Sequence, residues 1–153
     1  MPGGYSAVFD VPTKRGVAPL VLVGSAGAFV VETVGWPGRF HAANGKLMFE
    51  GGEAERLTHD LLRRALELKR QLLRAGVDIH VEAILVATEG VLVVSNGDVE
   101  PWRIAFDYVT VVTPQDVLAF VQSRPSRHPA RLTGAAQAVL EGSLVGIARA
   151  AGG

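Results

Sequence analysis

The chain of 153 residues is 48% hydrophobic, which is enough apolar material for one buried core. Its 15 basic and 15 acidic side chains balance, so the net charge does not indicate a dedicated partner such as nucleic acid, a membrane surface or an acidic substrate. The absence of cysteine excludes disulfides, thiolate metal sites and cysteine nucleophiles, and with neither a secretory signal nor a run of ~20 apolar residues we expect a cytoplasmic protein that does not span a membrane.

Short runs of β-branched and other apolar residues predict strands in the first third of the chain. The runs are Tyr5 to Val11, Leu20 to Val23, Ala28 to Val34, Arg39 to Ala43 and Lys46 to Glu50. The second and third runs are typical of central strands that are covered on both faces. Asn44-Gly45 joins the last two, and because Asn-Gly tolerates positive φ at both turn positions it predicts a hairpin.

An amphipathic helix is predicted from Glu53 to Ala75. Its leucines recur at spacings of three and four residues, and Gly76 follows at the point where a left-handed residue commonly ends a helix. Further strands are predicted over Ile79 to Ala87, Val91 to Val94 and Tyr108 to Val112. Thr113-Pro114 then predicts the start of a short helix that runs to about residue 122.

The order of strands, helix, strands and helix predicts an α/β protein of the mixed α+β kind, with a mixed sheet. We divide the chain into a domain over residues 1–123, a linker over 124–131 and a C-terminal helix over 132–153. The linker is rich in proline, serine and arginine, and the last helix is amphipathic but interrupted by glycine. The apolar face of that helix needs a cover, so it can support a homo-oligomer or a protein partner.

The region from Ala18 to Leu47 carries a specific order of features. Gly24-Ser25-Ala26-Gly27 is a turn, Phe29 to Val34 is a strand with one acid, Gly35-Trp36-Pro37-Gly38 is a tight corner, and Arg39 to Glu50 is a hairpin. This order, continued by the long helix and the strands after it, resembles the catalytic half of the nuclease-related domain (NERD) family. That family is a branch of the restriction-endonuclease-like, PD-(D/E)xK fold, so the resemblance implies a mixed central sheet flanked by helices.

The resemblance also implies a site for phosphodiester hydrolysis that has lost two of its groups. Enzymes of this kind hold a magnesium-type ion between carboxylates of two adjacent strands and use a lysine to ready the attacking water. Glu32 occupies the acid position, whereas Val34 stands at the lysine position and Pro19 at the position of the other acid. The family carries a further glutamate on a helix ahead of the first strand, for which this chain begins too late, so we expect a truncated and degraded member.

Three functions are compatible with this pattern. The first is a non-catalytic NERD-like module, a pseudoenzyme without a cofactor, which binds nucleic acid weakly or binds another protein. The second is a divergent Mg²⁺-dependent DNA nuclease in which Asp10 joins Glu32 as a metal ligand, with Lys14 or Arg15 supplying a cation. The third is a structural or oligomerising protein that associates through its C-terminal helix.

Two features near this region are candidates for contact with a substrate. Trp36 either packs the corner or stacks on a base. On the long helix, Arg63, Arg70 and Arg74 form a stripe with Arg56 that can follow a row of phosphates. The alternative is a solvent-exposed face held together by ion pairs four residues apart. The predicted pairs are Asp60–Arg64 and Arg63–Glu67.

Overall fold

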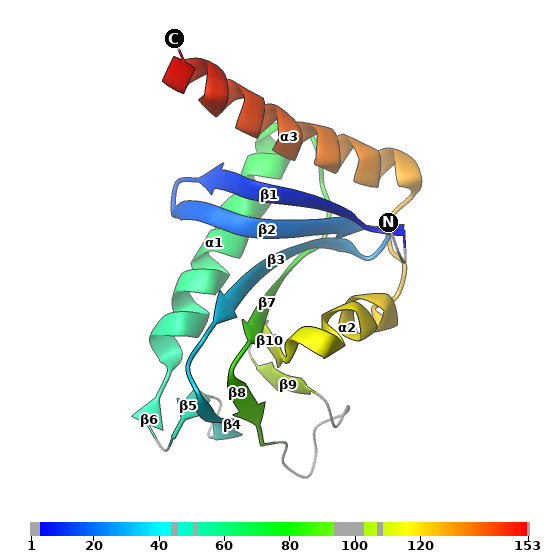
Figure 1. The fold of residues 1–153 in the computed structure, drawn as a ribbon. Helices are drawn as coiled ribbons and strands as arrows, with labels where there is room; N and C mark the ends of the chain where they lie inside the picture. Colours follow the sequence, from blue (N-terminus) through cyan, green and yellow to red (C-terminus); the bar gives the residue numbers. More distant parts are fainter. Residues whose placement is uncertain (1–3, 44–45, 51, 94–102, 107–108, 153) are drawn as a thin grey trace.

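The computed structural model describes residues 4–43, 46–50, 52–93, 103–106 and 109–152. These residues form a mixed α+β fold with a large sheet, a small sheet and three α-helices, the last of them C-terminal (Figure 1). The predicted fold class is therefore confirmed. Among the helices described, none is long and apolar enough to cross a membrane.

The large sheet has six strands in the order β1-β2-β3-β7-β10-β9. Their bounds are β1 Ser6–Thr13, β2 Gly16–Gly24, β3 Gly27–Val34, β7 Val81–Ala87, β10 Val109–Val112 and β9 Arg103–Phe106. The first three strands are antiparallel neighbours, β3, β7 and β10 run parallel, and β9 is antiparallel to β10. The sheet is mixed because β7 returns beside β3 only after a helical crossover.

Two helices cover one face of this sheet. α1 (Glu55–Arg74) crosses β3 and β7, and α3 (Ala130–Gly152) packs on β1 and β2 (Figure 1). Leu68 of α1 and Leu140 of α3 are fully buried in the same apolar cluster, together with valines of the sheet such as Val30. The two helices therefore share one core.

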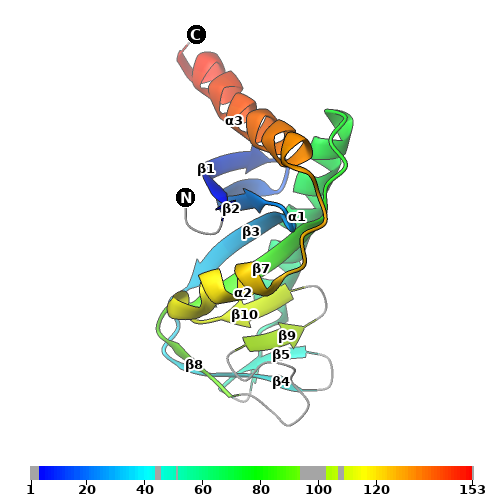
Figure 2. The ribbon, with the colours of Figure 1, turned by 90° about the vertical axis from the view of Figure 1, so that its right-hand side faces the viewer.

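The opposite face of the sheet is covered by a shorter helix, so the molecule has three layers (Figure 2). A 3-10 turn at Pro114–Asp116 leads into α2 (Val117–Ser123), which buries Phe120 against Phe29 of β3. Thr113 stands before the proline as predicted, and its hydroxyl donates to the Asp116 carboxylate at 2.9 Å. The helix that Thr113-Pro114 predicts is therefore present, and it packs on the sheet.

The periodic leucines explain α1. Leu61, Leu68 and Leu72 have no exposed surface, and Gly76 follows the helix with φ of 82°, in the left-handed region predicted for it. The helix begins two residues later than the sequence predicts. Gly52–Glu53 forms the short strand β6 beside β5 (Lys46–Phe49), so these residues pair in a sheet before the chain turns helical.

A small sheet in the order β6-β5-β4-β8 lies at the end of the large one. It contains β4 (Gly38–Ala43) and β8 (Gly90–Leu92) in addition to β5 and β6. β4 and β5 pair as the predicted hairpin, while the predicted turn at Asn44-Gly45 lies outside the described residues. Phe40 and Leu47 of this hairpin are fully buried and extend the core that lies beneath α1.

Residues 124–129 connect α2 to α3 and are held against the large sheet. The N–H groups of Arg127 and His128 both donate to the Ser25 carbonyl in the β2–β3 turn, at 2.8 and 2.9 Å. The hydroxyls of Ser25 and Ser126 lie 2.9 Å apart in a further hydrogen bond. The segment that reads as a linker in the sequence therefore carries fixed contacts with the β2–β3 turn.

Candidate functional site around Glu32

Glu32 lies near the end of β3, and the next two strands on one side of it, β2 and β1, each have an irregular position nearby. The pairing of β1 with β2 skips Asp10 and Pro19, which lie between the pairs Phe9–Leu20 and Val11–Ala18. The pairing of β2 with β3 ends at Leu20–Val31, one residue short of Pro19 and Glu32. Pro19 has no N–H to donate, and Asp10 opposite it has φ of 53°, a left-handed conformation that aspartate tolerates. The whole of β2 separates the two acids, so their backbones are about 10 Å apart and Asp10 does not lie against Glu32.

The Glu32 side chain points toward α1 and forms an ion pair with Arg64. The guanidinium Nη1 donates to the carboxylate Oε2 at 2.7 Å, and the two side chains are 32% and 16% exposed for Glu32 and Arg64. Side chains alternate along a strand, and Val30 and Val34, two residues to either side, lie in the cluster under α1. The carboxylate is therefore directed to the edge of the α1 interface, where Arg64 neutralises it.

Arg64 is also held by the turn between β1 and β2. Its Nε donates to the Arg15 carbonyl oxygen at 3.4 Å, and its guanidinium lies beside Gly16. Next to it is a hollow of about 220 Å³, lined by Arg15, Asp60, Arg63 and Arg64. With three guanidinium groups and one carboxylate on its walls, this hollow is suited to an anion.

The two positions that the resemblance assigns to lost catalytic groups are both inert. Val34 is 6% exposed and packs in the core under α1, and Pro19 is exposed beside Glu32. Neither side chain can bind a metal or accept a proton. Among the residues that the structure describes, no three histidine, cysteine, aspartate or glutamate side chains gather as a metal site.

The arginine stripe of α1 surrounds one acid, Glu67. Arg74 donates to its Oε1 at 3.2 Å and Arg70 to its Oε2 at 3.4 Å. The hydrogen bond from Arg74 holds the pKa of Glu67 below its usual range, and Arg70 and the nearby Lys14 act in the same direction. The carboxylate is only 7% exposed, whereas both guanidinium groups lie in solvent.

These contacts differ from the pairs that helix spacing predicts. Arg64 donates to Glu32 on the sheet instead of pairing with Asp60, and Glu67 accepts from residues three and seven positions later. The reason lies in the tertiary structure, because Arg64 is on the side of α1 that meets the sheet. There the partly buried carboxylate of Glu32 attracts the guanidinium more strongly than the solvated carboxylate of Asp60 does. Spacing along the helix carries no information about that partner.

Trp36 lies in the corner between β3 and β4. Its ring packs on Phe49 with centroids 5.2 Å apart and an interplanar angle of 52°, and the side chain remains 43% exposed. Gly38, two residues later, has φ of 149° and lies so close to Glu50 and Phe49 that a Cβ would overlap both. The corner is thus tightly packed, with part of the indole surface open to solvent.

A second group of charged residues, which no sequence pattern indicates, lies where β7 begins. Glu82 Oε2 accepts from Arg124 at 2.8 Å and lies 3.3 Å from Nε2 of His80, without hydrogen-bond geometry to the latter. The backbone N–H of His80 donates to Nε2 of His128 at 3.1 Å. Burial, and then the charges of His80, Lys69 and Arg127, lower the pKa of His128. Arg124 lies 42 residues from Glu82, and His128 lies 48 residues from His80, so spacing along the chain does not identify these two contacts.

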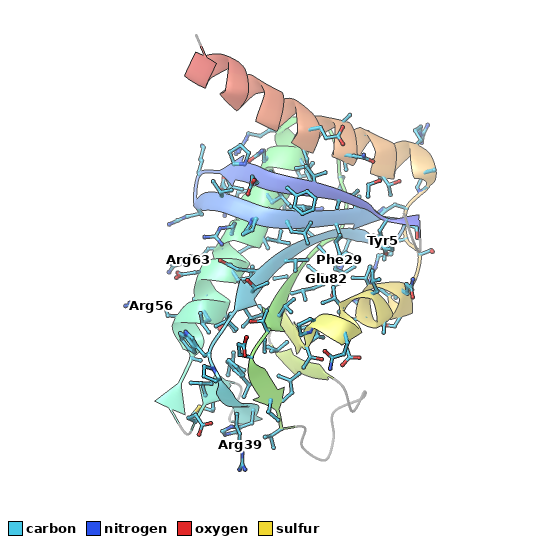
Figure 3. The ribbon with its side chains drawn as sticks, in the orientation of Figure 1. Tyr5, Phe29, Arg39, Arg56, Arg63 and Glu82 are labelled. Carbon is cyan, nitrogen blue, oxygen red and sulfur yellow. The ribbon has the colours of Figure 1, made fainter. Side chains whose placement is uncertain are left out.

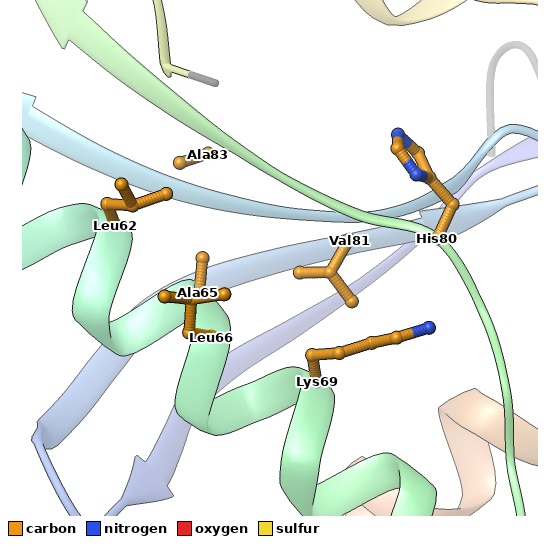
Figure 4. Close-up of a pocket in the computed structure, with 7 residues that line it drawn as sticks. All are labelled: Leu62, Ala65, Leu66, Lys69, His80, Val81 and Ala83. Atoms are coloured by element: carbon orange, nitrogen blue, oxygen red, sulfur yellow. The ribbon is translucent and has the colours of Figure 1, made fainter. Parts of the chain in front are cut away.

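An apolar groove of about 370 Å³ runs between α1 and β7 (Figure 4). It is lined by Leu62, Ala65, Leu66, Lys69, His80, Val81 and Ala83. The ammonium group at its end is already bound, because Lys69 donates to Asp78 at 2.8 Å and to the Ile79 carbonyl. The groove therefore has apolar walls and a polar end that is satisfied within the protein.

Comparison of this chain with protein families, with curated proteins and with solved structures finds no match. Any assignment of function therefore depends on the geometry described above. The most specific element of that geometry is the contact between Glu32 and Arg64, since it occurs at the one catalytic position that the resemblance leaves intact.

Proposed function

We propose that this protein is a non-catalytic module with a nuclease-like frame, in which an internal ion pair has replaced the metal site, and that it acts by binding nucleic acid or another protein. The observation that carries the proposal is the 2.7 Å contact between Arg64 Nη1 and Glu32 Oε2. A guanidinium stays protonated in proteins, so it can neither accept a proton from water nor act as a Lewis acid. Its charge also opposes the binding of a cation at the same carboxylate.

The frame itself supports the proposal. The antiparallel strands β1 to β3, the corner at Trp36, the β4–β5 hairpin, α1 and the returning strand β7 follow one another in the order that the NERD resemblance implies. Pro19 and Glu32 both lie one residue beyond the Leu20–Val31 pair that ends the β2–β3 ladder, and a metal-dependent nuclease needs a second carboxylate from an adjacent strand near its first. A cysteine-free composition is compatible with a cytoplasmic location.

The divergent nuclease is less well supported. A shared Mg²⁺ needs its oxygen ligands within about 2.1 Å of the ion, and β2 lies between Asp10 and Glu32. The positively charged group beside Glu32 is the guanidinium of Arg64. Unlike a lysine amine, a guanidinium cannot activate a water molecule for attack.

The test is a plasmid-nicking assay with Mg²⁺ and with Mn²⁺, using wild type, Glu32→Ala and Arg64→Ala. We expect no metal-dependent cleavage by any of the three above the rate of buffer alone, while a commercial endonuclease cuts the same plasmid. Cleavage by the wild type that requires metal and disappears in Glu32→Ala would refute the proposal, because contaminating nucleases do not respond to this substitution.

A further inference from the structure

We propose that the exposed face of α1 binds the phosphodiester backbone of nucleic acid through a row of arginines that leads past the hollow beside Arg64. This inference rests on the proposed function and names the ligand of the binding module. The row consists of Arg56, Arg63, Arg70 and Arg74, all exposed. Figure 3 shows Arg56 and Arg63 extending from α1 away from the sheet.

The row lies along one side of the helix, and its first three members are regularly spaced. Arg56, Arg63 and Arg70 are seven residues apart, so they drift by only about 20° around the helix at each step and stand about 10.5 Å apart along it. The distance from Arg56 to Arg74 is about 27 Å, which corresponds to about eight base pairs of duplex at 3.4 Å each. A periodic row of charges matches a partner whose charges are also periodic.

The charge of this face is only partly cancelled by local ion pairs, although the whole chain is neutral. α1 carries six basic and three acidic residues, and Lys14 and Arg15 add two more cations at the β1–β2 turn. Glu67 is shared between Arg70 and Arg74 and is buried at the base of the row. Asp60 is an exposed acid beside Arg63, so guanidinium groups outnumber carboxylates on the surface that meets solvent. Since the chain is neutral overall, the rest of the molecule carries the compensating negative charge. This separation of charge turns the α1 face toward a polyanion.

The hollow beside the row provides a local anchor. Three arginines, Arg15, Arg63 and Arg64, line a space of about 220 Å³ together with one acid, Asp60. Arg64 is held there by its hydrogen bonds to Glu32 and to the Arg15 carbonyl. A guanidinium that is already oriented loses less side-chain freedom when it binds a phosphate oxygen. Arginine is also the residue whose planar donor pair matches phosphate in two-point contacts.

A phosphate backbone fits this face better than an acidic peptide. The backbone presents a charge at about every 3.4 Å per strand in any sequence, so it meets an evenly spaced row in many registers. A folded or flexible acidic peptide has to place its carboxylates individually. We therefore expect binding that is independent of sequence and strongly dependent on salt.

The experiment is fluorescence anisotropy with a labelled 16-base-pair duplex and the matching single strand, in EDTA, so that no metal is involved. Four phosphate contacts predict that wild-type affinity for duplex falls about 100-fold between 50 and 200 mM salt. Arg63→Gln/Arg70→Gln should bind about tenfold more weakly at low salt and lose only about tenfold over the same range, because two contacts remain. Arg63→Lys/Arg70→Lys keeps the charge and should retain most of the salt dependence.

The matched control is Arg39→Gln/Arg131→Gln, which removes two exposed positive charges elsewhere on the chain and should bind like wild type. Melting temperatures of all variants identify any that fail to fold. Absence of duplex or single-strand binding at 50 mM salt, equal weakening by the control pair, or tighter binding to polyglutamate or to anionic phosphatidylserine vesicles would overturn the inference. Absence of binding together with absence of cleavage leaves the non-catalytic proposal intact, whereas metal-dependent cleavage refutes that proposal on its own.

Discussion

Arg64 joins three segments of the chain through one guanidinium group: α1, the end of β3 and the β1–β2 turn. Because it is 16% exposed, it is shielded from the water that weakens ion pairs on open surfaces. Loss of either partner leaves the other charge partly buried without a counterion. The pair is therefore a structural contact that joins α1 to the sheet.

Replacement of Arg64 by alanine should lower the free energy of unfolding by about 1–3 kcal/mol, because Glu32 loses a charged hydrogen bond. Arg63→Ala, at the exposed neighbouring position, should change it by less than about 0.5 kcal/mol. A double-mutant cycle with Glu32→Ala, measured by urea unfolding, should give a coupling of about 1 kcal/mol. A coupling within error of zero would show that the two charges do not interact in solution.

His128 should make stability depend on pH. Its Nε2 accepts the His80 N–H and must be unprotonated to do so, and burial lowers its pKa in the folded protein from the 6.5 of a free histidine. The unfolded chain thus binds this proton at a higher pH than the folded chain does. The contribution of His128 to stability is complete above about pH 6.5 and is lost as the pH falls from there toward the lowered pKa.

His128→Gln should therefore reduce the difference in unfolding free energy between pH 7.5 and pH 5.5, as measured with urea. His59→Gln is the matched control, since His59 is exposed on α1, and should leave the difference as in wild type. An unchanged difference in His128→Gln would mean that other groups set the dependence. Lys69, Asp78, His80 and Arg127 are the charged neighbours that the comparison has to hold constant.

Of the two residues in the Glu32–Arg64 contact, the sequence singles out only Glu32. Glu32 stands out because the strand and the corner around it are consecutive in the chain. Its partner is 32 residues away, and the helix pattern offered Arg64 a nearer acid in Asp60. Residues paired across elements leave no periodic trace, so only the packing of α1 on the sheet reveals them.

Among the elements, the β2–β3 turn is tightly constrained. Gly27 has φ of 131°, which side chains rarely adopt, and a Cβ there would overlap the carbonyl of His80 at the start of β7. The Ala28 N–H donates to that same carbonyl at 2.8 Å. The glycine therefore permits the close approach through which β3 and β7 begin to pair.

Gly27→Ala should lower the melting temperature by about 10 °C or prevent folding, because strain and overlap together cost about 3 kcal/mol or more. Gly134→Ala is the control: Gly134 lies in α3 with open space around its Cβ position, and helix propensity should make it neutral or stabilising by up to about 1 kcal/mol. Thermal unfolding followed by circular dichroism measures both. A Gly27→Ala protein as stable as wild type would contradict the close approach of β3 to β7.

Elements with a strong local pattern could be predicted, as α1 illustrates. The leucine periodicity and Gly76 predicted both ends of the helix to within two residues. The start was predicted too early because Glu53 belongs to β6, and β6 forms only by pairing with β5. β2 is longer than its apolar run, extending over Gly16–Gly24, because the polar turn before it continues the ladder with β1. Hydrophobicity marks the buried part of a strand and not its hydrogen-bonded length.

At the scale of the whole molecule, a metal site would show itself as added stability. A metal ion present at 100 times the Kd of its site adds about 2.7 kcal/mol to the free energy of unfolding. For a protein of this size, that raises the melting temperature by roughly 5–10 °C. We expect a shift below about 1 °C in 5 mM Mg²⁺ or 1 mM Mn²⁺, because Glu32 is already paired. In Arg64→Ala the carboxylate is released, and a metal-dependent shift in that variant alone would support displacement of an ancestral ion by the arginine.

The overall class could be predicted from the order of strands and helices, but the way in which the last quarter of the chain joins the sheet could not. Proline, serine and arginine in residues 124–131 are typical of a linker, and composition does not reveal that backbone groups there bond to Ser25. Main-chain hydrogen bonds depend on shape rather than on side-chain identity, so they leave little record in the sequence.

The cover that α3 places over β1 has a consequence for synthesis. Ala136 and Leu140 complete the cluster that contains Val8 and Val11 of the β1–β2 hairpin, yet they are made more than 120 residues after those valines. At a translation rate of ~5–20 residues per second, the apolar face of the hairpin stays uncovered by α3 for several seconds. The core beneath β1 and β2 is therefore completed only when α3 docks.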